Sequence, residues 1–273
     1  MGLKTLLIGL LRIITQLENK IMKKYDIVIV SHEKDFNNIK HIVEHCEKNL
    51  EFDSIHLILS DRHPYQHMEL LQTLTKRPVY KHIETDVLKI DKSRLRHRPE
   101  WIYQMMLKIF QNVTSNDNFL VIESDCIILK NLEFFNENKT IFYLGRDHYH
   151  QQYYTFNQKL LGIGREYDHS FISEFIMYDK KVVKELLNKT NCNTVEDFLE
   201  LLYNYVDGDS YPSDYDLYGN FYYTNYPENF ETKVLNFDMS GRSGNYWSDS
   251  EIISLVNSHQ DKDAISFHCW GHN

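Results

Sequence analysis

Two carboxylates, one residue apart, follow an apolar stretch of this 273-residue chain. Glu123 and Asp125 come directly after the run Phe119–Ile122, and a polar turn at residues 115–118 precedes that run. A short apolar run bounded by turn residues predicts a buried strand of a parallel sheet. Ligands bind at the carboxyl ends of such strands, so both acids, with Ser124 between them, should project into a site. Hard oxygen ligands of this kind suit Mg²⁺ or Mn²⁺ bound together with substrate phosphates.

Two other acid-x-acid triplets compete for this role, at residues 207–209 and 214–216. Asp207 and Gly208 are typical of a turn. Asp214 and Asp216 open a predicted helix, where carboxylates interact favourably with the helix dipole. Because only the triplet at 123–125 ends a predicted buried strand, we place the predicted metal site there.

The elements that would position these acids alternate between strand and helix. Apolar runs at 26–31 and 54–59 predict strands, and apolar residues at helical spacing over 35–50 predict a helix between them. A unit of this kind makes the two strands parallel. A helix at 65–76 and a strand at 79–84 continue the pattern. No glycine-rich phosphate loop follows these strands, so the sequence does not support a classical dinucleotide or ATP site.

A helix is predicted just ahead of the acid-bearing strand. It begins at Pro99, a residue that suits the first helical turn. Trp101, Gln104 and Lys108 fall at i, i+3 and i+7 and therefore share one face. Arg96 is the middle one of three arginines at 94–98. These cations either contact an anionic ligand or lie on a solvated helix face, and the residues alone leave both interpretations open.

The strand followed by acid-x-Asp resembles the metal-binding DXD element of GT-A glycosyltransferases. The pattern Trp-x-x-Gln-x-x-x-Lys ahead of it is similar to one in a poorly characterised group of bacterial and viral glycosyltransferase-like proteins. The resemblance implies an α/β fold, a Rossmann-like GT-A domain with a mostly parallel central sheet over residues 25–273. It implies that Glu123 and Asp125 hold Mn²⁺ or Mg²⁺ against the diphosphate of a nucleotide-sugar, Asp125 directly. Glu123 departs from the family's first Asp and is expected to touch the ribose or to act through water. The other expected donor contacts are Ser31, Arg96, Trp101, Gln104, Lys108, Ser124 and Trp270.

Four later residues are assigned roles, three in the context of the same resemblance and Glu174 from its own surroundings. The segment Ser213–Gly219 is similar to one that lies near the acceptor, which makes Asp214 the predicted general base. Glu174 lies inside a strand-like run over 170–179, and a buried acid there needs a partner such as an active site. His268, at the end of a short apolar strand, is predicted to complete the metal shell. Trp270 would stack on the donor or the acceptor.

The first 24 residues form a separate amphipathic helix in this interpretation. Leucine and isoleucine recur at helical spacing over residues 3–21, interrupted by charges that rule out a membrane span. The helix could pack on the domain, mediate a homodimer, or lie at a membrane surface. The formal net charge of −9 argues against a nucleic-acid binder. Four widely spaced cysteines suit a reducing, cytoplasmic setting, with peripheral contact to the inner face of a membrane as an option.

The predicted function is therefore metal-dependent sugar transfer from a nucleotide-diphosphate-sugar donor to a hydroxyl on a glycan or lipid-linked acceptor, in surface glycan or polysaccharide synthesis. Two alternatives stay open. A metal-dependent phosphohydrolase or nucleotidyltransferase also holds Mg²⁺ with acids at strand ends, but needs a second cluster of acids for two metals. A carbohydrate-binding protein without catalytic activity would carry the same acids as surface groups.

Overall fold

The computed structural model describes residues 23–62, 68–95, 98–192, 194–205, 212–243 and 246–270. The predicted N-terminal helix lies almost wholly outside these residues, and so do Arg96, the triplet at 207–209 and the side chain of Trp270. Among the residues described, no helix is long and apolar enough to cross a membrane.

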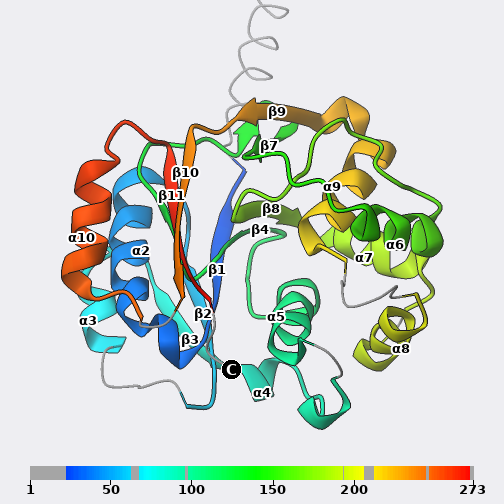
Figure 1. Cartoon of the computed structure of the whole chain (residues 1–273), viewed down its shortest axis with the longest axis horizontal. Coiled ribbons are helices and arrows are strands. Elements are labelled where there is room, and N and C mark those ends of the chain that lie inside the picture. The colour runs from blue at the N-terminus through cyan, green and yellow to red at the C-terminus, as the bar shows by residue number, and fades with distance from the viewer. Residues whose placement is uncertain are drawn as a thin grey trace, which may run out of the picture.

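A five-stranded sheet in the order β3-β2-β1-β4-β8 forms the centre of the molecule (Figure 1). Strands β1, β2, β3 and β4 are parallel to one another, and β8 pairs with β4 in the antiparallel direction. The predicted α/β fold with a mostly parallel central sheet is confirmed. The bounds of its strands are β1 Tyr25–Ser31, β2 Ile55–Leu59, β3 Val79–Ile83, β4 Asn118–Ile122 and β8 Phe175–Asp179.

Helices cover both faces of this sheet. Figure 1 shows α2, α3 and α10 on one side and α5 to α9 on the other. Alternate residues of β1 point to opposite sides, since Val28 and Val30 join one core cluster and Ile27 and Ile29 the other. The helix bounds are α2 Phe36–Asn49, α3 Met68–Thr73, α4 Glu84–Val87, α5 Pro99–Phe110, α6 Gln151–Leu161, α7 Lys180–Lys189, α8 Val195–Tyr205, α9 Asp214–Asn225 and α10 Asp249–Ser258.

Two smaller sheets complete the described part, in the orders β10-β11-β5 and β6-β7-β9. Strand β11 pairs with β5 in the antiparallel direction, with Ser266 opposite Cys126. Since β5 begins directly after Asp125, this pairing brings the end of the chain to the predicted site. The bounds are β5 Cys126–Ile128, β10 Phe237–Ser243, β11 Ala264–Trp270, β6 Phe135–Asn136, β7 Lys139–Leu144 and β9 Phe230–Val234.

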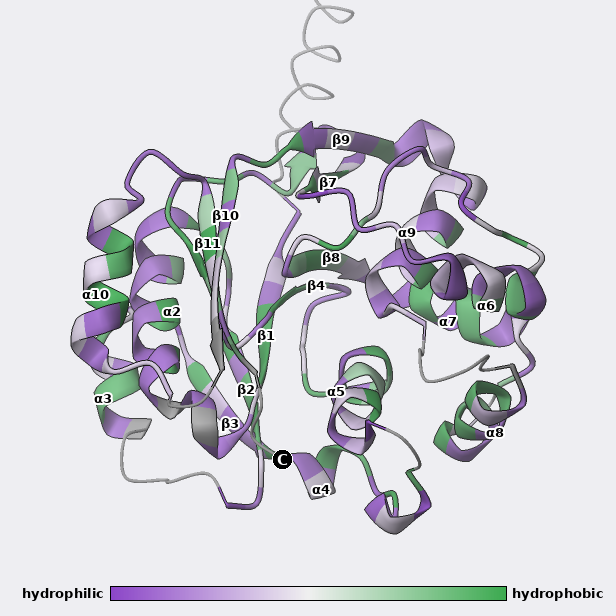
Figure 2. Ribbon diagram, viewed as in Figure 1, coloured by the Kyte–Doolittle hydropathy of each residue, from purple (hydrophilic) through white to green (hydrophobic). Residues whose placement is uncertain are grey.

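Hydrophobicity explains where these elements pack. Figure 2 shows hydrophobic colour along β4 and β8 in the interior, whereas the surrounding helices carry both colours. Every residue of β1 is buried, as is every residue of β2. Helix α5 begins at Pro99 as expected and buries most of its length.

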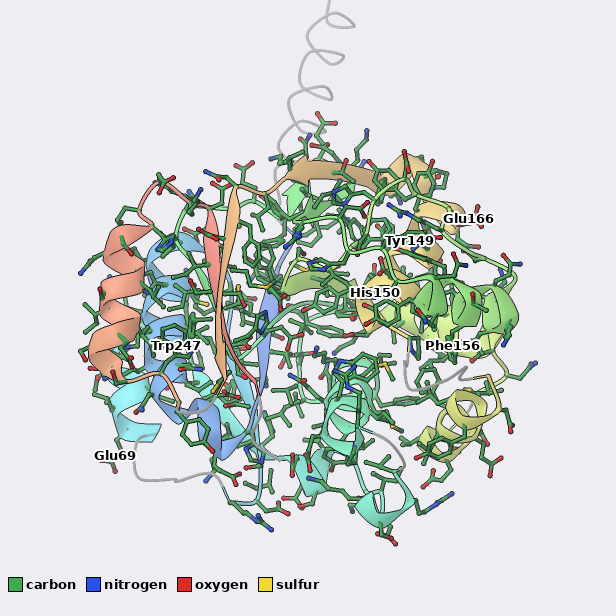
Figure 3. All side chains as sticks on the ribbon, viewed as in Figure 1. Glu69, Tyr149, His150, Phe156, Glu166 and Trp247 are labelled. Atoms are coloured by element: carbon green, nitrogen blue, oxygen red, sulfur yellow. The ribbon has the colours of Figure 1, made fainter. Side chains whose placement is uncertain are left out.

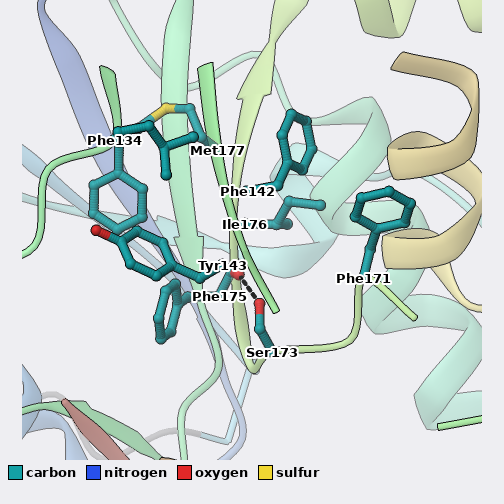
Figure 4. A pocket seen from close by; sticks show the side chains of 9 residues that line it. Phe134, Phe142, Tyr143, Phe171, Ser173, Phe175, Ile176 and Met177 are labelled. Carbon is teal, nitrogen blue, oxygen red and sulfur yellow. Dashed lines mark hydrogen bonds between the residues drawn. The ribbon is translucent and has the colours of Figure 1, made fainter. Parts of the chain in front are cut away.

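The strand predicted over residues 170–179 is shorter than expected and does not contain Glu174. Strand β8 begins at Phe175, and Glu174 precedes it with a φ of 64°. The Ser173 hydroxyl donates to the Phe175 carbonyl at 2.7 Å and so closes a tight turn around Glu174 (Figure 4). A left-handed residue cannot continue a strand, so the carboxylate leaves the sheet at its edge.

The pocket in Figure 4 lies in the apolar core, where β7 and β8 pack together. Its lining is almost entirely hydrophobic and includes Phe142, Phe171 and Phe175. The hydroxyl of Tyr143, which also lines it, donates to the carbonyl of Glu133 at 3.0 Å. We therefore regard it as a packing space of the core and not as a substrate site.

Candidate active site at the carboxyl edge of the central sheet

The turn after β4 is held by backbone hydrogen bonds to two distant elements. The Glu123 amide donates to the Glu174 carbonyl at 2.9 Å, just before β8. The Phe267 amide, in β11, donates to the Asp125 carbonyl at 2.9 Å. The end of β4, the middle of β11 and the start of β8 therefore meet at one edge, which is where the parallel strands also end.

Ser124 anchors this turn to the start of α2. Its hydroxyl donates to an Asp35 carboxylate oxygen at 2.8 Å, and its carbonyl accepts from the Asn38 side chain at 3.0 Å. The residue is buried. Ser31 is also buried, and its hydroxyl donates to the carbonyl of His32 at 3.3 Å. Both serines thus have protein partners, and their predicted donor contacts stay untested.

Asp125, His268 and Glu174 form what we call the edge cluster. His268 Nδ1 lies 2.8 Å from Asp125 Oδ2, and its Nε2 lies 3.6 Å from Glu174 Oε1. Ser266 Oγ is 3.1 Å from the same Nε2. Burial lowers the pKa of His268, but hydrogen bonds to Asp125 and Glu174 outweigh it and raise that pKa to about 10. With both nitrogens protonated the imidazole is a cation between two carboxylates, and it would have to lose a proton to bind a metal ion.

Lys108, Glu123 and Asp214 form a second group, the buried triad. The Lys108 ammonium contacts Glu123 Oε1 and lies 3.5 Å from Asp214 Oδ2. Its side chain is 5% exposed. The Tyr215 hydroxyl donates to Glu123 Oε1 at 2.7 Å, and Gln104 Nε2 donates to Glu123 Oε2 at 2.8 Å. Both oxygens of Glu123 are therefore bound by groups from α5 and α9.

The charges of the buried triad depend on one another. Burial raises the pKa of Glu123, and the neighbouring Lys108 ammonium opposes this effect. Burial would lower the pKa of Lys108, but Asp214 and Glu123 raise it above its ordinary value. Asp214 also accepts from the Tyr178 hydroxyl at 3.2 Å. Lys108 is thus a fixed cation that offsets two enclosed acids.

Asp216 follows Tyr215 in the first turn of α9 and is fully buried. It accepts from the Phe171 amide at 2.8 Å and from the Ser170 hydroxyl at 3.2 Å. Burial raises the pKa of Asp216 to about 6, although both hydrogen bonds act in the opposite direction. Asp216 therefore connects the segment before β8 to the first turn of α9 through these hydrogen bonds.

The structure brings most of the predicted side chains into these two groups. Gln104 and Lys108 share a face of α5, as expected, and both meet Glu123. Trp101 lies farther back on the helix, where the Arg98 guanidinium is 4.9 Å from its ring centre. The prediction that Asp214 and Asp216 open a helix is confirmed, and Ser213 caps that helix.

Asp125 and His268 suit a divalent ion, and Glu123 suits it less. A carboxylate oxygen and an imidazole nitrogen both bind Mn²⁺, and Mg²⁺ is often held by one or two protein ligands plus phosphates. Across the described residues, no three His, Cys, Asp or Glu side chains are grouped so that they could hold a metal. Both Glu123 oxygens are already engaged within the buried triad. The arrangement therefore fits two protein ligands, with further ligands coming from substrate or water.

Two residues of the site were not anticipated from the sequence. Tyr215 and Tyr178 bind the acids of the buried triad through their hydroxyls. Tyr215 stands between the two acids of the triplet at 214–216, and this position was the one available signal. Tyr178 lies in the apolar sequence of β8, and the residues next to it in the sequence give no sign of a polar role.

The family model DUF6492, described as a family of unknown function, matches residues 17–262. No curated protein matches the chain.

Among solved structures, the chain is similar to three glycosyltransferases at low identity. Mouse xyloside xylosyltransferase 1, in its apo form, matches with 11% identity and a TM-score of 0.49, over 89% of this chain and 97% of the other. The bifunctional glycosyltransferase WbbM, also apo, gives 13% and 0.48, over 93% and 47%. An active-site mutant of LgtC gives 9% and 0.48, over 89% and 86%. With TM-scores under 0.5, these similarities carry no argument about the reaction, which has to rest on the site.

Proposed function

The chain belongs to DUF6492, a family of unknown function, and we propose that it is a metal-dependent glycosyltransferase that uses a nucleotide-diphosphate-sugar donor. The edge cluster carries this proposal. A carboxylate, an imidazole and a second carboxylate converge where β4, β11 and β8 meet. This is the edge at which open α/β sheets bind ligands. The sequence resemblance to GT-A enzymes supports the same reaction class.

Asp125 and His268 would hold the divalent ion. When bound, such an ion neutralises the charge that develops on a diphosphate leaving group. The two side chains lie 2.8 Å apart, so small movements and the loss of the His268 proton would let both bind one ion. The Phe267 amide fixes the Asp125 backbone and Ser124 fixes the turn. The pair is therefore positioned before any substrate arrives.

Glu174 is the carboxylate that we assign to the reacting groups. Its side chain is 12% exposed, and its left-handed backbone turns it out of the strand toward His268. Strained conformations of this kind persist where the surroundings enforce them, often at active sites. It could accept the acceptor's proton or stabilise positive charge on the sugar. Asp214, whose partners are Lys108 and Tyr178, is enclosed, and we assign it to charge balance.

The buried triad would support the site from behind. Lys108 fixes Glu123 and Asp214, and Glu123 is the residue from which the turn to Asp125 begins. We therefore do not assign Lys108 a direct contact with donor phosphates. Its side chain is 5% exposed and has two acidic partners, so it offers little surface to a ligand. A two-metal phosphohydrolase is less well supported, since Asp214 and Asp216 are both enclosed and hydrogen-bonded.

A product assay tests the proposal. The full chain would be incubated with MnCl₂ and each member of a panel of uridine- and guanosine-diphosphate sugars, and release of the nucleoside diphosphate would be measured. We expect release from at least one donor, abolished by EDTA and restored by Mn²⁺. Replacement of Glu174 by Gln should leave nucleotide binding intact while release falls. No release from any donor, together with no binding of UDP or GDP in the presence of Mn²⁺, would contradict the proposal.

A further inference from the structure

Tyr149 is an unusually exposed aromatic residue in the loop that follows β7. The residue is 56% exposed, but neighbouring side chains hold its ring. It stacks on Tyr154 with ring centres 5.6 Å apart, and the Arg165 guanidinium lies 5.0 Å from its centre. The ring is therefore held by Tyr154 and Arg165, while much of the residue stays open to solvent. Figure 3 shows Tyr149 and His150 near the start of α6.

Arg165 is itself fixed, so that the support under Tyr149 is rigid. Its guanidinium binds both carboxylate oxygens of Asp147, at 2.9 and 3.0 Å. Asp147 in turn accepts from the Ser170 amide at 2.9 Å. Arg165 also lies 5.5 Å from the ring centre of Tyr154. Both contacts are made by the single nitrogen Nη2 and are charge-assisted, which strengthens them.

The loop that carries Tyr149 starts beside the edge cluster. The backbone of Gly145 lies so close to the next segment that an added Cβ would be 3.3 Å from the Ile172 carbonyl oxygen and 3.6 Å from Ser173 Cα. Glu174 follows immediately in that segment. In the same loop, burial lowers the pKa of His148, and the charge of Glu174 opposes this effect. The exposed ring is thus connected to the reacting carboxylate through four loop residues.

We propose that the Tyr149 ring, backed by Tyr154 and Arg165, is a platform for a sugar ring of the acceptor. That the sugar belongs to an acceptor rests on the proposed function. That the ring binds a sugar rests on the geometry alone. A supported aromatic face packs against the apolar C–H face of a pyranose. The Asp147–Arg165 pair lies beside it and offers hydrogen-bonding groups to hydroxyls. A ring that its neighbours already hold in place loses little freedom when a ligand binds.

Saturation-transfer difference NMR with methyl glycosides of glucose, galactose, mannose and N-acetylglucosamine tests the platform on the full chain. We expect transfer to at least one glycoside. In Tyr149→Ala the loss of one stacked ring should weaken the affinity for that glycoside roughly fivefold or more. Tyr149→Phe keeps the ring and should retain the signal. Tyr80→Ala is the matched control, because Tyr80 is another exposed tyrosine, 48% exposed on β3.

Failure of the platform and failure of the enzyme give different results. No transfer to any glycoside, or equal transfer in the parent and Tyr149→Ala, overturns the platform. Glycoside binding that depends on Tyr149, in a protein with no donor breakdown, would keep the platform and reject the glycosyltransferase.

Discussion

At the scale of single residues, the position of Lys108 separates two interpretations of one sequence pattern. The spacing Trp101, Gln104, Lys108 suggested a cation facing donor phosphates. The structure places its ammonium between Glu123 and Asp214, with 5% of the side chain exposed. Burial of two carboxylates is tolerated only when a cation compensates them. The principal effect of Lys108 is therefore on stability.

We predict that Lys108→Met destabilises the fold by about 3 kcal/mol or more, because it leaves two buried acids without their cation. Chemical denaturation measures this. Lys181→Met is the matched control, since the Lys181 side chain is 77% exposed and its acidic partner is 4.0 Å away. We expect the control to change stability by less than about 0.5 kcal/mol.

Adding Asp214→Asn to Lys108→Met should recover part of the loss, because one uncompensated charge disappears. If Lys108→Met were as stable as the parent and lost only nucleotide affinity, the phosphate-contact interpretation would be restored.

At the scale of elements, α9 is the helix that holds the acids against the sheet. Its glycine, Gly219, faces Phe171, and an added Cβ would be 2.3 Å from the ring. Phe171 cannot move freely, since the rings of Phe142 and Tyr167 lie 5.6 and 5.4 Å from it. The absence of a side chain at Gly219 is what allows α9 to approach this closely.

Gly219→Ala tests that close packing. Helix propensity alone would stabilise the variant by about 1 kcal/mol. Overpacking against a fixed ring costs about 1–3 kcal/mol and should prevail at a contact this short. We therefore expect a net loss in the free energy of unfolding by denaturation. In a Phe171→Leu background the same substitution should cost less, and an equal cost in both backgrounds would disprove the proposed contact.

The first turn of α9 also makes stability depend on pH. Asp216 has an ordinary pKa of 3.8 and a folded-state pKa of about 6, so the folded protein favours its protonated form. The resulting stabilisation is full below pH 3.8 and is lost as pH rises through 6. Asp216→Asn keeps an acceptor for the Phe171 amide but cannot ionise.

The advantage of Asp216→Asn over the parent should grow by roughly 2 kcal/mol between about pH 4 and pH 7, as expected for a shift of about two pKa units. Denaturation of both proteins across this range measures it. A constant difference would show that Asp216 titrates normally in the folded state.

At the scale of the whole molecule, the central sheet could be predicted because its signals are local. Strands β1, β2 and β4 are apolar runs buried on both faces, and α5 has a proline at its start. The sheet formed by β5, β10 and β11 was largely missed. Strand β10, with the sequence Phe237–Ser243, is polar and contains a glycine, so its pairing depends on partners distant in the chain.

The same limit applies to the site. The turn at Glu123 and Asp125, and the approach of His268 to it, followed from strand-end position and family resemblance. The exclusive pairing of Glu123 with Lys108, Gln104 and Tyr215 did not, because it depends on how α5 and α9 pack. The metal roles of Asp125 and His268 stay predictions that the contacts favour.

The most direct test of the central claim compares Asp→Asn variants at two positions that flank strand β4. Asp125 follows the carboxyl end of β4, and Asp117 precedes its amino end as an exposed residue. Thermal unfolding would be followed with UDP or GDP in the presence and absence of MnCl₂. A ligand that binds only the folded state raises the melting temperature, and it does so more at a given concentration when it binds more tightly.

We predict an Mn²⁺-dependent rise for the parent and for Asp117→Asn, and none for Asp125→Asn, each compared with the same protein without ligand. An equal rise in Asp125→Asn, or no rise in the parent with either nucleotide, would contradict the assignment of a metal–nucleotide site to the edge cluster.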